Sequence, residues 1–387
     1  MTTHSTDVDG RRVVIVGGGT GGTVVANKLA DALRGELEAG AVEVELVTDT
    51  PDHVYKPIFL YVAFDRKSVA DSRRPHREIL DRRVDCRLDH VTAIDTDEKR
   101  LTLEDGDSLG YDYLVIATGA TLDPEAVDGL AEGGHHFYTA DAAETLRDEL
   151  ATFTSGHLVL STVGITHMCP AAPIEFALIV DDWLRERGRR DDIDFTYTYP
   201  VDGAHTIESI DDWVTPLLAA RDIALETDFE VDSVDPDREH ITATDGRTLE
   251  YDLLVTIPPH VGGPIVERAE LGEEWIEVDN HTLEATRAED VSALGDVTDV
   301  PTSKAGSAAH YQAGVVADRI ASAVRGQTPT TTYDGRTLCF VEAGLDEATF
   351  VSFDYDLDPV VRPPSQFVHW AKLAYNESYW LTARGLL

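Results

Sequence analysis

The sequence predicts an α/β protein with two Rossmann-like dinucleotide-binding domains and a C-terminal region that ends in an amphipathic helix. Three observations lead to this prediction. Near the N-terminus, a short β-branched strand runs directly into a glycine-rich loop and a helix. A second strand–loop–helix unit begins at His157. Segments 111–116 and 251–256 both begin with Tyr-Asp-x-Leu-Val, and internal repetition of this kind is typical of duplicated units.

The first unit carries the signature of a dinucleotide-binding loop. Residues 12–16 read as a buried parallel strand, and the pattern G-x-G-x-x-G follows before a helix that we predict over 23–33. In this pattern Gly17 makes the tight turn, Gly19 lets the backbone approach a pyrophosphate, and Gly22 lets helix and strand pack closely. We expect the phosphates at the helix N-terminus, beside Thr20.

The next segments are expected to hold the rest of the same cofactor. A strand predicted over 42–47 leads to Thr48 and Asp49, and either side chain can bind the ribose. The segment 55–59, rich in aromatic residues and centred on Pro57, can pack against the edge of a flavin ring. An ordinary loop is the alternative for that segment.

Two later strands supply further flavin signals at their carboxyl ends. The strand predicted over 111–116 runs into Ala-Thr-Gly, where the small residues Thr118 and Gly119 let the chain pass close to a cofactor. A strand that starts at Val291 ends in Gly295 and Asp296, and the carboxylate there can accept a hydrogen bond from a ribityl hydroxyl. Together these signals predict FAD.

The chain is strongly acidic, with a net charge of −40 that arises from 72 acidic and 32 basic residues. Because the acids are spread along the whole chain, we expect a surface adapted to a high-salt cytoplasm, as in a halophile; an acidic partner-binding surface is the alternative. Nucleic acid is an unfavourable partner for such a surface. Lys304 stands out among so few lysines. With the helix predicted over 307–325, it can stabilise an anionic reduced flavin.

Targeting signals and metal-binding motifs are not predicted. Residues 1–12 are polar, without the apolar core of a secretory signal peptide. No apolar run reaches the roughly 18 residues that a membrane-spanning helix needs. We therefore expect a cytoplasmic protein without a metal site.

The second unit lacks the phosphate-binding loop of the first. Its first strand is predicted over 158–163, but residues 164–170 contain a single glycine, so NAD(P)H is not expected to bind there in the usual mode. Cys169 stands in place of the loop, at the start of a helix predicted over 170–187. Because a helix N-terminus lowers a thiol pKa, we predict that Cys169 is a reactive thiolate. Glu175 in the same helix is a candidate proton carrier; a solvated acid is the alternative.

The C-terminal region contains a strand with Cys339 and an aromatic helix predicted over 365–381. Phe367 and Trp370 fall on one face of this helix, which suits either core packing or a monotopic membrane contact. The predicted domains are a discontinuous FAD-binding domain (1–120 and 252–328), a second Rossmann-like domain (121–251, with a helix over 140–152) and the C-terminal region (329–387).

Together, these features resemble the two-dinucleotide-binding-domain flavoproteins with a glutathione-reductase-like fold. Within that group the chain is similar to the sulfide:quinone oxidoreductase family. The motifs that carry the resemblance are Cys-Pro-Ala-Ala-Pro-Ile-Glu at 169–175, Leu-Cys-Phe-Val-Glu at 338–342, Pro-Thr-Ser-Lys-Ala-Gly at 301–306 and His-Trp-Ala-Lys at 369–372.

The resemblance implies FAD as the cofactor, with Cys169 and Cys339 as a redox pair on one flavin face and Glu175 as a proton-moving acid. Sulfide attacks the disulfide, a persulfide forms, and two electrons pass through FAD to a membrane quinone. The quinone contacts that we carry over are Phe340, Phe367, Trp370 and Tyr379. The C-terminal helix is then expected to contact the membrane peripherally, and a homo-oligomer is compatible with this reading.

One departure from the family keeps alternatives open. Many members carry a third redox cysteine after the Ala-Thr-Gly segment, where this chain has Tyr138. A flavocytochrome-type sulfide dehydrogenase with another acceptor is therefore one alternative. The others are a type II NADH:quinone dehydrogenase, which shares the fold, and a flavin-binding redox sensor that does not turn over.

Overall fold

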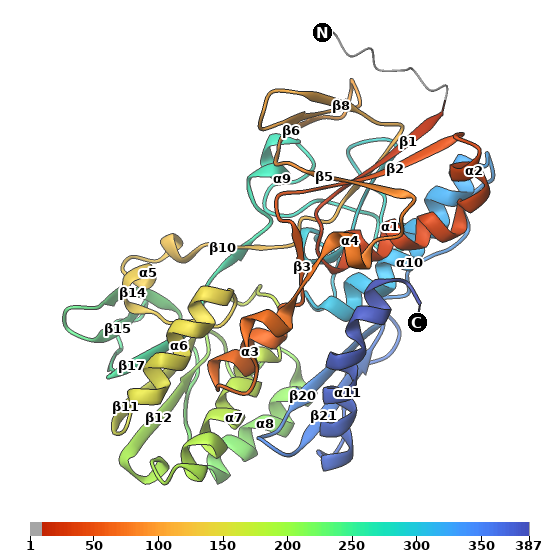
Figure 1. Cartoon of the computed structure of the whole chain (residues 1–387). Helices are drawn as coiled ribbons and strands as arrows, with labels where there is room; N and C mark the ends of the chain where they lie inside the picture. The colour runs from red at the N-terminus through yellow and green to blue at the C-terminus, as the bar shows by residue number, and fades with distance from the viewer. Residues whose placement is uncertain (1–9, 387) are drawn as a thin grey trace.

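The computed structural model describes residues 10–386 and contains two parallel sheets, with a C-terminal region beside them (Figure 1). Residues 1–9, on which the prediction of no signal peptide largely rests, lie outside the described part. None of the helices within 10–386 is long and apolar enough to cross a membrane.

The first sheet has five parallel strands in the order β19-β9-β1-β2-β5. Its central strand is nearly inaccessible to solvent, since Val13, Val14 and Ile15 are 0% exposed, as expected for a strand covered on both faces. The strands are β1 (Arg11–Val16), β2 (Val42–Thr48), β5 (Val84–Leu88), β9 (Tyr113–Ile116) and β19 (Val291–Ala293).

Two helices lie side by side against this sheet, α1 (Thr20–Ala32) and α10 (Gly306–Val324) (Figure 1). The predicted geometry of the glycine loop is confirmed at Gly17 and Gly22. Gly17 has a φ of 107°, which favours glycine, and a Cβ on Gly22 would overlap the Gly17 carbonyl oxygen. The helix predicted over 23–33 begins three residues earlier, at Thr20.

The second sheet has four parallel strands in the order β13-β12-β11-β17. They are β11 (Gly156–Thr162), β12 (Ile193–Thr198), β13 (Ala224–Glu226) and β17 (Leu253–Ile257). The helices of this domain are α6 (Ala140–Thr152), α7 (Ala172–Glu186) and α8 (Glu208–Ala220). The α6 bounds equal the predicted ones, because Thr139 caps the helix by accepting a hydrogen bond from the Ala142 amide.

The predicted domain boundary at residue 252 is wrong. We expected the second Tyr-Asp-x-Leu-Val segment to return the chain to the FAD-binding domain, but β17 pairs with β11 in the second sheet. The repeat arises because β9 and β17 occupy equivalent positions in the two domains: each follows a three-stranded antiparallel sheet and joins the parallel sheet of its own domain. The chain crosses back after β17, where β18 (His260–Val261) pairs with β10 (Thr121–Leu122).

Each domain also carries a three-stranded antiparallel sheet before its closing strand. These sheets are β6 (Val91–Asp95), β7 (Arg100–Leu103) and β8 (Ser108–Gly110), and β14 (Val231–Asp235), β15 (His240–Ala243) and β16 (Thr248–Glu250). The short elements are α2 (Arg34–Glu38), β3 (Asp52–Val54), α3 (Ile58–Ala63), η1 (Val69–Ser72), β4 (Arg73–Pro75), α4 (His76–Ile79), η2 (Pro124–Ala126), α5 (Leu130–Gly133), η3 (Arg190–Asp192), α9 (Pro264–Arg268) and η4 (Gly295–Val297).

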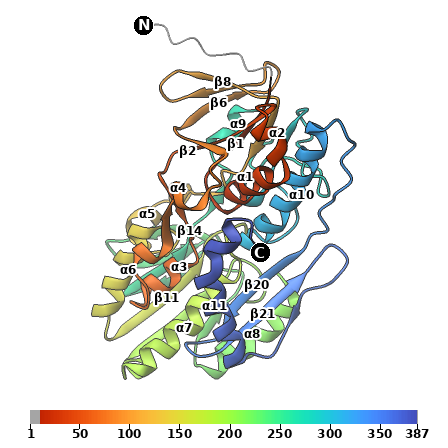
Figure 2. The same ribbon diagram turned by 45° about the vertical axis from the view of Figure 1, so that its right-hand side comes forward.

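The C-terminal region lies against both domains (Figure 2). An antiparallel sheet of β20 (Thr337–Glu342), β21 (Ala348–Phe353) and β22 (Val360–Val361) packs under α11 (Gln366–Ala383). The buried face of α11 is largely polar, with Lys372, Asn376 and Tyr379 at 7%, 6% and 2% exposure. Its apolar residues Phe367 and Trp370 are instead 75% and 59% exposed, so the aromatic stripe does not pack in the core.

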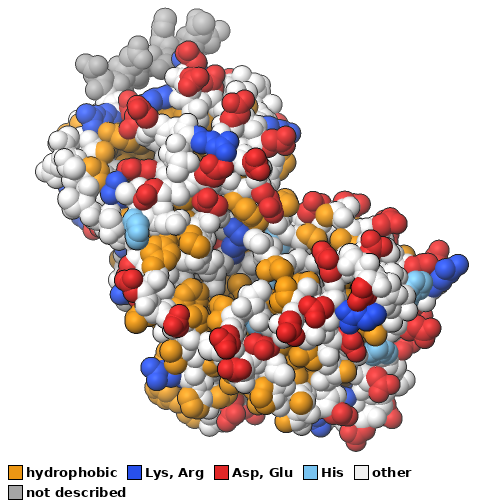
Figure 3. Space-filling model, turned by 180° about the vertical axis from the view of Figure 1, so that it is seen from behind, with side chains coloured by type: hydrophobic (Ala, Val, Ile, Leu, Met, Phe, Trp, Pro, Cys, Tyr) orange, Lys and Arg blue, Asp and Glu red, His pale blue; other side chains and the backbone are white. Residues whose placement is uncertain are grey.

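The acidic residues are distributed over the surface rather than gathered in one place. Figure 3 shows Asp and Glu side chains across both halves of one face, with apolar areas between them. This distribution agrees with the even spread of acids along the chain.

Candidate active site

The structure brings three predicted cofactor segments to one edge of the first sheet. The glycine loop follows β1, the Ala-Thr-Gly segment follows β9, and Gly295 with Asp296 follows β19. Since these strands are parallel and adjacent, their carboxyl ends meet at the same edge, where α/β folds bind dinucleotides.

The backbone at this edge fits a dinucleotide. A Cβ placed on Gly19 or Gly119 would meet no atom within 4 Å, so the space in front of both residues is open. Gly19 is also the N-cap of α1, which has no side-chain cap and no acidic residue in its first turn. The amides of that turn therefore remain available to a pyrophosphate, beside the Thr20 hydroxyl.

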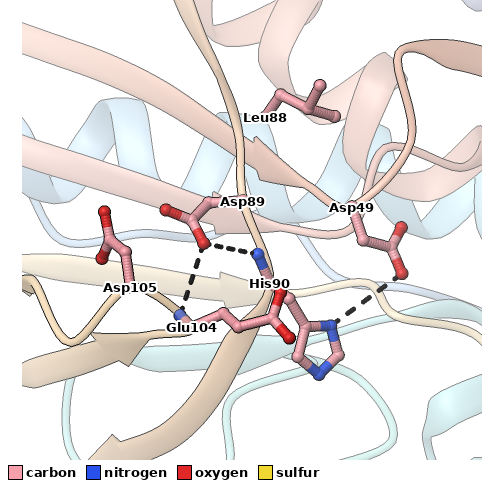
Figure 4. A pocket seen from close by; sticks show the side chains of 6 residues that line it. All are labelled: Asp49, Leu88, Asp89, His90, Glu104 and Asp105. Atoms are coloured by element: carbon pink, nitrogen blue, oxygen red, sulfur yellow. Dashed lines mark hydrogen bonds and ion pairs between the residues drawn. The ribbon is translucent and has the colours of Figure 1, made fainter.

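Of the two predicted ribose ligands, Thr48 and Asp49, the structure places only Thr48 near the glycine loop. Thr48 is 4% exposed, and its Oγ1 lies close to the Cα of Gly18. Asp49 instead lines an open pocket of about 410 Å³ at the ends of β2 and β5 (Figure 4). The side chains around this pocket are mainly acidic: Asp49, Leu88, Asp89, His90, Glu104 and Asp105. Such a pocket suits hydroxyl donors rather than phosphates.

His76 is a residue of this site that sequence reasoning missed. It is 2% exposed, its ring lies against Gly18 and Thr48, and neither of its ring nitrogens has a hydrogen-bond partner within the protein. Unpaired buried nitrogens are costly, so His76 is suited to bond a group that enters the cleft. No local pattern marks it, because His76 is the first residue of the short helix α4, and the preceding strand β4 brings it back to the loop.

Two lysines lie near Asp296. Lys304 donates to the carbonyl oxygens of Asp296 at 2.7 Å and Thr298 at 2.9 Å, and its ammonium lies over the Trp275 ring. Burial lowers the pKa of Lys304 to about 8. Lys304 thus holds the turn that presents Asp296. Lys56, which faces Asp296 and donates to the sulfur of Met168 at 3.3 Å, is more exposed, and sequence reasoning did not single it out. Pro57 beside it is exposed and caps α3.

Cys169 occupies a strained position between the two domains. Its φ is 53°, in the left-handed region that is uncommon for residues other than glycine. Its amide donates to the carbonyl oxygen of Lys304 at 2.7 Å, and its own carbonyl accepts from Ala172 in the first turn of α7. The backbone thus fixes Cys169 beside the start of α10, and such strained backbone is common at active sites.

Cys339 lies beside the same helix terminus. Its thiol interacts with the Ser307 hydroxyl in the first turn of α10, and it lies near enough to Cys169 for a negative charge on Cys339 to raise the pKa of Cys169. The structure thus brings together the two cysteines that the motifs paired, both as free thiols. Cys86, the third cysteine, is exposed on β5, in the other domain.

The prediction that Cys169 has a lowered pKa is wrong for the dithiol. Loss of hydration, followed by the negative charge of Glu175 and the neighbouring Cys339, raises the pKa of Cys169 well above its usual range. The same loss of hydration raises the pKa of Cys339 to about 11. The helix argument failed because α7 begins only at Ala172 and carries Glu175 in its first turn. Both thiols therefore hold their protons at neutral pH.

Glu175 is buried in a charged network rather than solvated. It is 4% exposed, forms an ion pair with Lys372 of α11, and accepts a hydrogen bond from the Glu342 amide at 2.8 Å. Burial raises the pKa of Glu175, and Lys372 opposes that rise. The neighbouring carboxylates raise the pKa of Lys372. An acid beside both thiols, with a raised pKa, can exchange protons with them.

Tyr138, at the place of the absent third cysteine, closes the other side of Cys169. It is 7% exposed, and its hydroxyl donates to the Met168 carbonyl oxygen at 3.1 Å. Its ring is edge-on to His260, with 4.9 Å between centroids. Tyr138 therefore supports the backbone that carries Cys169.

The predicted quinone residues are divided between surface and core. Phe340 is partly buried and its ring lies 6.0 Å from that of Tyr375 on α11, while Phe367 and Trp370 are exposed. Tyr379 is buried; its hydroxyl lies 2.7 Å from Thr20 Oγ1 and 2.8 Å from His53 Nε2. Tyr379 therefore ties α11 to the nucleotide-binding loop.

Comparisons with known proteins agree with this architecture. Residues 11–162 match the model of the family described as pyridine nucleotide-disulphide oxidoreductase. The mitochondrial sulfide:quinone oxidoreductase of Mus musculus is 25% identical over 91% of this chain and 80% of its own. The crystal structure of the Aquifex aeolicus sulfide:quinone oxidoreductase covers 97% of this chain and 92% of its own, with a TM-score of 0.85 at 23% identity. An NADH dehydrogenase-like protein of Mycobacterium tuberculosis is 34% identical, but over only 40% of this chain and 38% of its own.

These findings first define the class. The chain is an oxidoreductase with a two-domain flavoprotein fold. Within that class, it is a homologue of the sulfide:quinone oxidoreductases, and the similarity extends over both domains and the C-terminal region.

Proposed function

We propose that this protein binds FAD and oxidises sulfide through the Cys169–Cys339 pair, passing the electrons to a membrane quinone. The observation that carries the proposal is the meeting of both cysteines at the N-terminus of α10, next to the cofactor edge of the first sheet. The similarity to sulfide:quinone oxidoreductases along nearly the whole chain supports the same function.

Different residues at the predicted FAD site would bind different parts of the cofactor. The α1 amides and Thr20 would hold the pyrophosphate, and Asp296 would accept from a ribityl hydroxyl. When bound, the flavin accepts an electron pair at the cysteines and releases it to the quinone. The protein supplies orientation, proton exchange and exclusion of water.

The cysteine chemistry begins from the disulfide. Hydrosulfide attacks one sulfur, so a persulfide forms on one cysteine and the other leaves as a thiolate with the electron pair. The high pKa of both cysteines makes either one a poor leaving group as a bare thiolate, so the step would need a proton delivered to the departing sulfur. Glu175 then takes or returns the proton that each thiol loses or gains.

NADH is a poor electron donor for this chain. Residues 164–170 do not form a glycine loop, and the first turn of α7 contains Glu175. A carboxylate at a helix N-terminus repels the phosphates that a pyridine nucleotide would place there. The NADH:quinone dehydrogenase alternative is therefore disfavoured.

We also propose that the exposed face of α11 contacts the membrane peripherally. Phe367, Trp370 and Leu381 on this face are 75%, 59% and 47% exposed, and Leu386 follows at 64%. Large exposed apolar residues on a helix with a polar inner face suit insertion into a lipid interface. The electrons would then reach a quinone that remains in the lipid.

Sulfide-dependent reduction of decylubiquinone, compared with NADH-dependent reduction, tests the proposal. We expect sustained turnover with sulfide and none with NADH. Turnover with NADH would favour the dehydrogenase alternative. A single flavin reduction by sulfide, without turnover on quinone or cytochrome c, would favour a redox sensor, and turnover on cytochrome c alone would favour the flavocytochrome-type enzyme.

A further inference from the structure

A second acid–base branch extends from Glu175 towards the surface. Glu342 is its centre: Tyr61 donates to Glu342 Oε1 at 2.6 Å, and Nδ1 of His369 lies 2.8 Å from Glu342 Oε2. Lys372 lies 3.8 Å from Glu342 Oε1 while it also pairs with Glu175. Four elements, α3, α7, β20 and α11, thus place their polar groups in one continuous network.

The charges of this network do not balance without an additional proton. Glu175 and Glu342 are 4% and 1% exposed, and among residues 10–386 Lys372 is the one ammonium that pairs with both. A buried unpaired carboxylate is costly, so the group is stable when it holds one more proton. His369, in contact with Glu342, can carry that proton as an imidazolium.

His369 is the network member placed nearest to the proposed quinone route. Its side chain is 12% exposed, whereas that of Glu342 is 1% exposed. In the sequence of α11 it stands between the exposed residues Phe367 and Trp370. Alternation along β20 also puts Phe340 and Glu342 on one face of the strand, the face that meets α11.

We propose that His369 donates a proton to the quinone and that Glu342 holds and reloads this proton. This inference rests on the proposed function. Reduction of the quinone to a quinol needs two electrons and two protons. FAD held at the proposed site would supply the electron pair and one proton, and the His369 imidazolium would supply the second proton, leaving a neutral imidazole. Lys372 and Glu175 then return the proton that thiol oxidation releases on the other side of the network.

Flavin reoxidation measured without sulfide tests this role separately. The holoenzyme is reduced anaerobically with one equivalent of dithionite and mixed with decylubiquinone in a stopped-flow instrument at neutral pH. His369→Gln should slow reoxidation by about 100-fold, because the proton donor is lost, and added imidazole should restore much of the rate.

Two further variants distinguish proton donation from a structural effect. Glu342→Gln should also slow reoxidation, because the carboxylate that holds and reloads the His369 proton is lost. The control His240→Gln alters a histidine on β15, in the antiparallel sheet of the second domain, and should behave as wild type. Reoxidation of His369→Gln within twofold of wild type, without any effect of added imidazole, would overturn the inference. A wild type that quinone does not reoxidise at all would instead overturn the proposed function.

Discussion

Replacing Lys372 by methionine is the sharpest test of the buried network. At an effective dielectric constant of about 20, unit charges 3.8 Å apart interact by about 4 kcal/mol, which is the scale of the Lys372–Glu342 contact. Glu175 adds a second contact that is closer still. Removing one partner of a buried pair typically costs about 3–5 kcal/mol, because a buried charge is left uncompensated. We therefore expect Lys372→Met to lower the free energy of unfolding by that amount at neutral pH.

The stability lost in Lys372→Met should increase as the pH rises. Burial already raises the pKa of Glu175 above its ordinary 4.5, and loss of the lysine raises it further. The folded variant then binds a proton that the unfolded chain releases, so its stability falls as the pH rises above about 4.5. At acid pH part of the loss should be recovered, and Glu175→Gln combined with Lys372→Met should recover part of it at neutral pH.

Urea unfolding of the FAD-loaded protein, followed by tryptophan fluorescence in matched salt, measures these differences. Lys67→Met is the matched control, because Lys67 forms an ion pair of 2.5 Å with Glu377 that is largely exposed to solvent. Such a surface pair contributes about 0–1 kcal/mol. A Lys372→Met variant that loses no more stability than Lys67→Met would refute the reasoning.

Three further predictions concern the cysteines, the glycine loop and the membrane face. Cys169→Ser and Cys339→Ser should each abolish flavin bleaching by sulfide while FAD stays bound; bleaching at the wild-type rate in either variant would contradict the redox pair. Gly22→Ala places a Cβ against a loop carbonyl and should lower the ratio of flavin to protein absorbance, whereas Gly35→Ala, with open space around it, should keep full FAD content. Trp370→Ser should reduce co-sedimentation with lipid vesicles and leave reduction by sulfide unchanged; undiminished sedimentation would exclude the exposed face of α11 as the contact.

Much of the fold could be predicted from local sequence patterns. Val13 to Val16 form a central strand because four consecutive β-branched residues suit burial on both faces. The loop after them has the predicted geometry, since only glycine tolerates the close contacts at Gly17 and Gly22. The repeated Tyr-Asp-x-Leu-Val segment was located correctly as a strand, but its sheet depended on pairing with β11, which no local pattern encodes.

The site was less predictable because its polar contacts are long-range. The aromatic pattern of α11 favoured either core packing or membrane contact, yet the inner face is held by Lys372, whose partner Glu175 is 197 residues away in sequence. The missing glycine loop marks Cys169 as a candidate site residue, and this stays a prediction. The lowered pKa predicted for Cys169 is wrong, because burial and Glu175 outweigh a helix terminus that begins three residues later.

Anaerobic titration with sulfide, followed at flavin wavelengths, tests directly whether electrons enter through the cysteine pair. We predict that sulfide alone bleaches the bound FAD, that NADH does not, and that subsequent addition of quinone restores the oxidised spectrum. A flavin that stays oxidised in excess sulfide but is bleached by NADH would contradict electron entry through Cys169 and Cys339.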